Sequence, residues 1–255
     1  METIKKLALI TGATSGIGEA SAIKFAENNY NLILTGRRDD RLQKLKKHLV
    51  SVYHCEVQTL SFDVRDNNAV IKKFNSLADE WRNIDVLINN AGLSVGLEPI
   101  HEGMIDDWER MIDTNVKGLL YVSRAIIPWM VERKQGHVIN IGSIAGKEIY
   151  PGGNVYCATK YAVDALSKAM RMDLVKHNIK VSQICPGAAD TEFSLVRFKG
   201  NKEKADNVYQ GFTPLYAKDI AETIYYVTTL PPHVNINDLV MTATAQASVA
   251  IIDRK

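Results

Sequence analysis

The sequence predicts an α/β fold: a single doubly wound parallel sheet of about seven strands with helices on both faces. Short apolar runs alternate with longer amphipathic or charged segments along all 255 residues. The apolar runs are continuous, which is typical of strands covered on both faces of a parallel sheet. We therefore expect one domain over residues 1–255, with right-handed crossovers between the strands.

Seven apolar runs are the expected strands. The first has the sequence LALIT at residues 7–11 and leads into a glycine-bearing turn. The others are expected at residues 31–35, 57–64, 84–90, 136–143, 179–187 and 239–241.

The segments between these runs are the expected helices. They lie at residues 16–28, 39–49, 66–81, 106–133, 154–177 and 217–229. Residues 188–212 contain a charged stretch and are expected to form a loop that covers the substrate.

Composition excludes several function classes. A net charge of +2 gives no electrostatic basis for binding nucleic acid. The six histidines form no metal-ligand motif, and the three cysteines have no C-x-x-C spacing. No apolar run approaches the roughly 18 residues of a membrane span, and no signal-peptide pattern precedes the first strand. We expect a cytoplasmic protein without metal and with no nucleic-acid or membrane partner.

Glycines mark the end of the first strand. In TGATSGIG at residues 11–18, Gly12 permits a tight turn and Gly16 lets the backbone approach a pyrophosphate. Gly18 lets the following helix pack closely on the strand, and the helix N-terminus offers free N–H groups to phosphate. The spacing differs from G-x-G-x-x-G, but strand, turn and helix follow in the order of a Rossmann-like dinucleotide site.

A tyrosine and a lysine lie at i and i+4 near the start of the expected helix 154–177. Tyr156 and Lys160 therefore share one helix face. A lysine ammonium nearby is expected to lower the pKa of the phenol and to make it a general acid/base. The alternative at this point is an amphipathic helix with an interior tyrosine and a surface lysine.

Seven motifs in order resemble the classical short-chain dehydrogenase/reductase family. They are the glycine motif at 11–18, DV at 63–64, NNAG at 89–92, Asn115, Ser143, the Y-x-x-x-K motif at 156–160, and PG at 186–187 with Thr191 four residues after the glycine. The resemblance covers nearly the whole chain. It implies that Tyr156 is the catalytic acid/base, that Lys160 assists it and holds the nicotinamide ribose, and that Ser143 binds the reacting oxygen. It implies that Asn115 holds a water linking the lysine to solvent.

The predicted cofactor is NADP. Arg37 and Arg38 follow the second strand, where guanidinium groups suit a 2′-phosphate. The alternatives are two surface arginines paired with Asp39 and Asp40, or Asp39 serving a ribose hydroxyl of NAD. The remaining cofactor residues that the resemblance implies are Thr14, Ser15, Ile17, Asp63, Val64, Asn89, Ala91, Gly92, Pro186, Gly187 and Thr191.

The C-terminal third resembles the NADP-dependent serine/3-hydroxy acid dehydrogenase subgroup, through residues 191–200, 205–209 and 230–241. This implies oxidation of L-serine, L-allo-threonine and related 3-hydroxy acids, and reduction of malonic semialdehyde. Such substrates carry a carboxylate, for which Arg197 is the candidate ligand. The alternative role of Arg197 is a salt bridge that holds its loop closed. Glu148 is a candidate for a substrate amino group, the alternative being an exposed loop charge.

Other interpretations stay open. Ala188 and Ala189 stand where the subgroup carries bulkier residues, which leaves the pocket size and the preferred substrate open. A 3-oxoacyl or broad-specificity ketone reductase is an alternative, because its catalytic core would be the same. A non-catalytic NADPH sensor is a further alternative. The apolar stretch at 243–252 is expected to be a last buried element or, as our prediction, a contact between subunits of a homotetramer.

Overall fold

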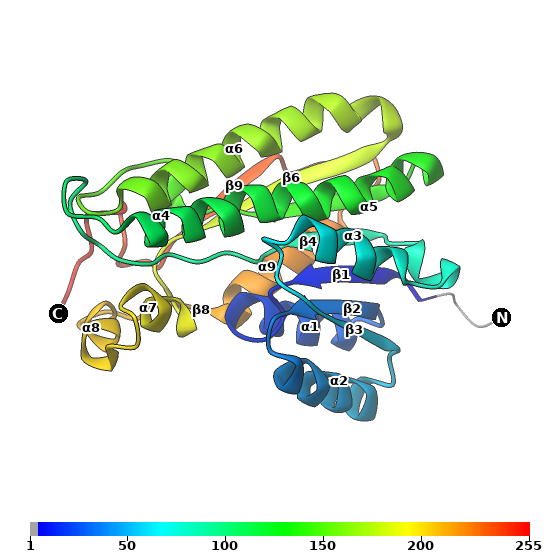
Figure 1. The fold of residues 1–255 in the computed structure, drawn as a ribbon, viewed down its shortest axis with the longest axis horizontal. Coiled ribbons are helices and arrows are strands. Elements are labelled where there is room, and N and C mark those ends of the chain that lie inside the picture. Colours follow the sequence, from blue (N-terminus) through cyan, green and yellow to red (C-terminus); the bar gives the residue numbers. More distant parts are fainter. Residues whose placement is uncertain (1–4) are drawn as a thin grey trace.

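Seven parallel strands form the central sheet, in the order β3-β2-β1-β4-β5-β6-β9 (Figure 1). The structure is a computed structural model that describes residues 5–255, so residues 1–4 of the predicted domain lie outside the described residues. The strands are β1 (Leu7–Thr11), β2 (Asn31–Gly36), β3 (Val57–Ser61), β4 (Val86–Asn89), β5 (Gly136–Ile141), β6 (Ile179–Pro186) and β9 (Asp238–Met241). The predicted doubly wound sheet is confirmed.

Helices cover both faces of the sheet (Figure 1). One face carries α1 (Gly16–Glu27), α2 (Asp39–Tyr53) and α9 (Ala217–Thr229). The other carries α3 (Asn67–Asn75), α4 (Ile105–Ile112), α5 (Leu119–Arg133) and α6 (Asn154–Leu174). In β1, Ala8 and Ile10 pack into the first core while Leu7 and Leu9 pack into the second. Both faces are therefore buried, which explains why the strand sequences are continuously apolar.

Two expected helices are interrupted. The helix expected at 66–81 ends at Asn75, and a separate 3₁₀ turn follows at Asp79–Arg82. In the helix expected at 106–133, a π-helical turn at Asp113–Gly118 separates α4 from α5. Such turns are often found at functional sites, and this one carries Asn115.

The 188–212 segment is more regular than the loop that the sequence predicts. It contains β7 (Ala189–Asp190), α7 (Glu192–Arg197) and α8 (Lys202–Asn207), and β7 pairs with β8 (Leu215–Tyr216). Both helices are only six residues long, too short to show the apolar periodicity that would predict them. Figure 1 shows α7 and α8 projecting beyond the body of the sheet.

The switch in strand order lies between β1 and β4, which pair side by side although β2 and β3 intervene in the chain. Open α/β sheets bind ligands at such a point, outside the carboxyl ends of the strands. The ends of β1, β4, β5 and β6 bring the glycine turn, the 90–97 loop, Ser143 and Gly187 to this edge.

Candidate active site

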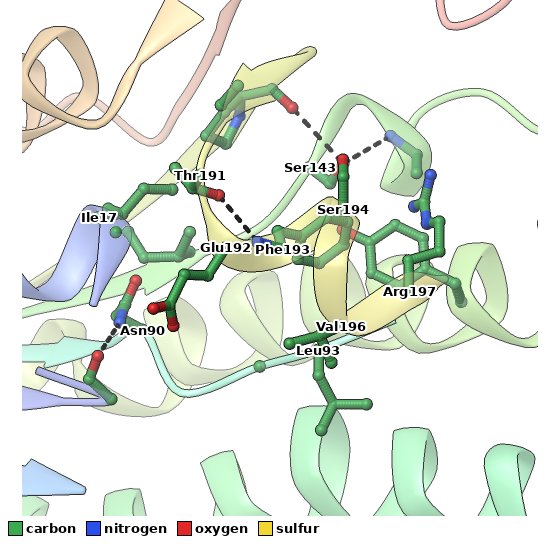
Figure 2. Close-up of a pocket in the computed structure, with 18 of the residues that line it drawn as sticks. Ile17, Asn90, Leu93, Ser143, Thr191, Glu192, Phe193, Ser194, Val196 and Arg197 are labelled. Atoms are coloured by element: carbon green, nitrogen blue, oxygen red, sulfur yellow. Dashed lines mark hydrogen bonds between the residues drawn. The ribbon is translucent and has the colours of Figure 1, made fainter. Parts of the chain in front are cut away.

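A cavity of about 580 Å³ opens at this edge of the sheet. It is lined by all the predicted cofactor residues except Gly18 and Asn89. Ser143, Tyr156, Lys160 and Arg197 also line it, so the fold gathers the predicted chemical groups around one space. Figure 2 shows the part of this cavity that lies between Ile17, Ser143 and Arg197.

The glycine turn forms a narrow cradle at the N-terminus of α1. Gly16 has a φ of +55°, a conformation that side chains other than glycine rarely adopt. A Cβ on Gly18 would lie 2.3 Å from the carbonyl oxygen of Gly12. Gly18 therefore packs closely against the backbone of the turn, in agreement with the helix packing that the sequence predicts. It does not face the cavity.

Asn90, and not Asn89, holds this turn. Its amide Nδ2 donates to the carbonyl oxygens of Thr11 and Gly12 at 2.8 and 3.2 Å. Figure 2 shows Asn90 with one of these bonds drawn. The buried Asn89 instead donates to Ser123 Oγ and Asn140 Oδ1, at 3.0 and 2.9 Å. Asn89 is not among the residues that line the cavity, because it belongs to β4 and its side chain lies inside the protein, so its cofactor contact stays a prediction.

Tyr156 lies in the first turn of α6 and is 7% exposed. Lys160 is one turn later, with Nζ 5.9 Å from the centre of the Tyr156 ring and donating to the carbonyl oxygen of Ile141 at 2.8 Å. Both residues are buried, so the alternative of a surface lysine is excluded.

The expected lowering of the Tyr156 pKa by Lys160 is not found. Burial raises the pKa of the Tyr156 phenol above its ordinary value, opposed by the positive charge of Arg197 and by the Ser143 hydroxyl. Burial also lowers the pKa of Lys160 to about 8. Desolvation is the largest effect on the pKa of each group, and sequence spacing does not reveal it.

Ser143 follows β5 and faces the cavity (Figure 2). Its Oγ accepts a hydrogen bond from the Ala145 amide at 3.1 Å and lies 3.5 Å from the carbonyl oxygen of Pro186. The second contact is at the limit of hydrogen-bond distance, so the hydroxyl hydrogen can turn toward a ligand.

Asn115 does not line the cavity but braces its wall. Its Nδ2 donates to the carbonyl oxygen of Leu93 at 2.8 Å and to Thr159 Oγ1 at 3.0 Å, while its Oδ1 accepts from the Leu93 amide at 2.8 Å. The π-helical turn thus ties the loop after β4 to α6. The predicted water-holding role stays a prediction.

A cluster of arginines lies beyond the glycine turn. Arg38 Nη2 donates to Thr14 Oγ1 at 2.9 Å and to Ser15 Oγ at 2.8 Å. Arg38 and Arg41 both form salt bridges with Glu192, at 2.9 and 2.6 Å. Although partial burial acts to raise it, hydrogen bonds from Arg41 and Arg38 lower the pKa of Glu192 to about 2.

Arg37 is the more available of the two predicted phosphate ligands. Its Nη1 lies 3.9 Å from Asp63, whose carboxylate is bound more closely by Arg65 at 2.7 Å. Neither Arg37 nor Arg38 pairs with Asp39 or Asp40 among the described residues, contrary to the surface-arginine alternative. A cradle of backbone amides followed by guanidinium groups fits a dinucleotide that carries an extra phosphate.

Arg197 enters the cavity from the end of α7 (Figure 2). Its guanidinium Cζ lies 5.3 Å from the centre of the Tyr156 ring. The described residues include no carboxylate in a salt bridge with Arg197, so the alternative of an ion pair that closes the loop is not observed.

Glu148 does not reach the cavity. Its Oε2 accepts a hydrogen bond from the backbone amide of Val249 at 2.8 Å, in the C-terminal segment. This contact gives no support to the candidate role of Glu148 toward a substrate amino group, which stays a prediction.

Residues 6–201 match the short chain dehydrogenase family. The chain belongs to this family. It is 50% identical over 242 residues to the NADP-dependent 3-hydroxy acid dehydrogenase YdfG of Salmonella typhi, covering 94% of this chain and 96% of that protein. It is 43% identical over 250 residues to sulfoacetaldehyde reductase 2 of Chromohalobacter salexigens, covering 97% and 98%. The closed form of serine dehydrogenase complexed with NADP+ superposes with a TM-score of 0.92 at 46% identity, covering 98% of this chain and 99% of that one.

Several residues at this family site were missed by sequence reasoning. Asn90 stands in the NNAG motif, but the sequence does not reveal which of its two asparagines faces the turn. Tyr150 and Phe193 line the cavity beside Tyr156, as do four residues of the C-terminal segment: Gln246, Val249, Ile252 and Arg254. The stretch at 243–252 is visibly apolar in the sequence, yet nothing in it indicates a cavity wall.

No helix among residues 5–255 has the length and apolar character that crossing a membrane requires. Within the same residues, no group of three or more His, Cys, Asp or Glu side chains is placed to hold a metal ion.

Proposed function

We propose that the protein is an NADP-dependent dehydrogenase that reversibly oxidises the 3-hydroxyl group of small 3-hydroxy acids. The observation that carries this proposal is the position of Arg197, a cation 5.3 Å from the ring centre of the predicted acid/base Tyr156. A substrate that reacts at Tyr156 and carries a carboxylate on a neighbouring carbon can meet both groups at once. L-Serine, L-allo-threonine and 3-hydroxypropionate have this arrangement.

The relatives support an anionic substrate. A 3-hydroxy acid and sulfoacetaldehyde both carry an acid group separated from the reacting carbon by one carbon atom. A guanidinium binds carboxylate and sulfonate alike through paired N–H donors. Arg197 is the cavity-lining residue that we assign to this acid group.

The proposed cofactor site begins at the glycine turn. The pyrophosphate would lie against the N-terminus of α1, and the 2′-phosphate would be bound by Arg37, with Arg38 once its bond to Glu192 rearranges. Asp63 and Val64 would border the adenine, and Ala91 and Gly92 the ribose. Thr191 would anchor the carboxamide, and Lys160 the ribose beside the nicotinamide. When bound, NADP accepts the hydride that leaves the substrate carbon.

Residues of the chain itself carry out the proton transfer. In oxidation, Tyr156 as phenolate removes the hydroxyl proton while the hydride leaves C3, and a carbonyl forms. In reduction, the Tyr156 phenol returns that proton to the carbonyl oxygen. Ser143 donates a hydrogen bond to the same oxygen, which stabilises it as its charge changes. The charge of Arg197 favours the phenolate, whereas burial disfavours it.

The experiment that tests this function follows NADP+ reduction with L-serine, L-allo-threonine and 3-hydroxypropionate against simple secondary alcohols. Turnover of the three acids with little turnover of the alcohols is expected. Turnover of the alcohols alone would instead favour a broad ketone reductase. That second candidate has one observation in its favour: apolar side chains from Leu93, Leu97, Val196 and Phe198 line the same cavity.

We also propose a cytoplasmic homotetramer. Apolar side chains on α4 and α6 are exposed in the isolated chain, among them Ile105, Met172 and Tyr161. Ile251 in the C-terminal segment is 65% exposed, in keeping with the predicted contact at 243–252. Light scattering of the purified protein is expected to give the tetramer mass, and a monomer would contradict the proposal.

A further inference from the structure

Arg197 is enclosed by three aromatic rings. Its Cζ lies 5.0 Å from the centre of the Phe193 ring, 5.3 Å from that of Tyr156 and 5.8 Å from that of Tyr150. Guanidinium groups within about 6 Å of such centres are attracted to the ring faces. The rings restrict where the charge can lie, but stacking alone does not fix which way the N–H groups point.

Two hydroxyl groups supply that direction. Arg197 Nε donates to Ser94 Oγ at 3.2 Å, and Nη2 donates to the Tyr150 hydroxyl at 3.0 Å. Nη1 has no hydrogen-bond acceptor among the described residues, so both of its N–H groups remain for a ligand. A guanidinium carries its five N–H donors in one plane. Fixing the directions of Nε and Nη2 therefore also fixes the direction of Nη1.

The two hydroxyls come from parts of the chain that are separate from α7. Ser94 lies in the loop after β4 and is 2% exposed, and Tyr150 lies in the segment before α6. A backbone hydrogen bond also links the loop after β4 to the end of α7: the Gly96 amide donates to the carbonyl oxygen of Arg197 at 2.9 Å. Burial raises the pKa of the Tyr150 phenol, against the lowering effect of the Arg197 charge, so the phenol stays neutral near pH 7.

We propose that Ser94 and Tyr150 are positioning residues that determine specificity: they aim Arg197 so that an acid group bound at Nη1 places the reacting carbon beside Tyr156. This inference rests on the proposed function, which supplies the acid group. Ser94 does not line the cavity, so it would act on the substrate only through Arg197.

The test compares 3-hydroxypropionate with 3-hydroxypropionamide, which has nearly the same shape without the charge. In Ser94→Ala and in Tyr150→Phe, kcat/KM for the acid is expected to fall about tenfold, mainly through KM, because a hydrogen bond to a charged group is lost. The value for the amide is expected to fall less, so that the acid-to-amide ratio decreases. Arg197→Lys should resemble both variants, because a compact ammonium cannot bind two hydroxyls and a ligand in fixed directions.

Two control variants separate positioning from general damage. Tyr53→Phe makes the same chemical change at the end of α2, where the hydroxyl donates only to Glu27, and is expected to behave as wild type. Tyr209→Phe removes bonds to Ser194 and Ala189 inside the 188–212 segment, and is expected to affect acid and amide in equal proportion. Titration with NADPH, followed by its fluorescence, verifies that each variant is folded.

The outcomes are distinguishable. A lower acid-to-amide ratio in Ser94→Ala and Tyr150→Phe, with NADPH affinity retained, supports the inference. A wild-type ratio in both variants, or an equal loss for acid and amide, overturns it and leaves the proposed function standing. If the wild-type protein does not prefer the acid to the amide, the proposed function itself is wrong and the inference falls with it.

Discussion

The guanidinium of Arg197 and the ring of Tyr156 lie 5.3 Å apart, one at the end of α7 and the other at the start of α6. The cation therefore belongs to the 188–212 segment, whereas the predicted acid/base belongs to α6, which packs against the central sheet. A positive charge at this place favours the phenolate and opposes the effect of burial. Under the proposed function, binding of the acid group and proton transfer are linked through this one side chain.

Replacing Tyr156 with Phe should remove the group that exchanges the proton. We expect kcat to fall by about 10²–10⁴-fold or more, the usual contribution of a general acid/base. NADPH affinity should stay near the wild-type value, because the ring that lines the cavity is retained. Steady-state rates with 3-hydroxypropionate, together with a fluorescence titration, measure both quantities. Retained turnover would refute the assignment of Tyr156.

Removing the charge of Arg197 should shift the pH profile of oxidation. Oxidation requires the phenolate, so its rate rises with pH through the pKa of Tyr156. Arg197 lowers that pKa, so Arg197→Ala should raise it and move the rising limb to higher pH, while Arg197→Lys should move it less. The profile is measured on kcat/KM for 3-hydroxypropionamide, which has no acid group to bind. If the rising limb of the pH profile stays in place in Arg197→Ala, the charge of Arg197 does not act on Tyr156.

Arg38→Ala should weaken NADPH more than NADH. A charge-assisted contact to the 2′-phosphate contributes roughly 1.5–3 kcal/mol, so we expect NADPH to bind about 10- to 100-fold more weakly. NADH lacks this phosphate, and its affinity should be nearly unchanged. Arg124→Ala, an exposed arginine on α5, is the matched control. An equal loss of NADPH and NADH would mean that Arg38 serves only to brace Thr14 and Ser15.

His137 should make the fold sensitive to mild acid. It is buried in β5 with Nε2 2.8 Å from Ser182 Oγ, and burial, aided by the Lys180 charge, lowers its pKa to about 3. The unfolded chain takes up this proton near pH 6.5, but the folded chain does not. The contribution of buried, neutral His137 to the free energy of unfolding is therefore complete above about pH 6.5. It is lost as the pH falls toward 3, by up to about 1.4 kcal/mol per pH unit.

The comparison of wild type with His137→Gln isolates this effect. Glutamine keeps a partner for Ser182 but does not titrate, so its free energy of unfolding should fall less steeply with decreasing pH. Urea unfolding at pH 7, 6 and 5 measures the two slopes. If the free energy of unfolding falls with decreasing pH equally steeply in both proteins, His137 is protonated without cost in the folded protein.

Local patterns in the sequence were sufficient for most of the fold and for the centre of the site. Continuous apolar runs predict the strands because both sheet faces are covered, and the glycine turn, Ser143 and the pair of Tyr156 and Lys160 lie at the ends of these elements. These features come together at the carboxyl edge because parallel strands end there and the helices that follow begin there. The family resemblance added their roles.

The rest depends on contacts between distant parts of the chain. The pKa of Tyr156 follows burial by several elements, and the bond of Arg38 to Glu192 joins residues that spacing does not relate. Whether Asn89 or Asn90 holds the turn depends on where β4 ends, a boundary that sequence patterns place only to within a few residues. Ser94 gives no signal of its own, since a lone serine in a loop is ordinary.

The most direct test of the proposed function runs the reaction in reverse, with NADPH and malonic semialdehyde. We expect NADPH absorbance to fall in step with the formation of 3-hydroxypropionate, with NADH much less effective and Tyr156→Phe inactive. Ethyl acetoacetate, a ketone without a free acid group, should be reduced far more slowly. Rapid reduction of the ketone together with no reduction of the semialdehyde would contradict the account.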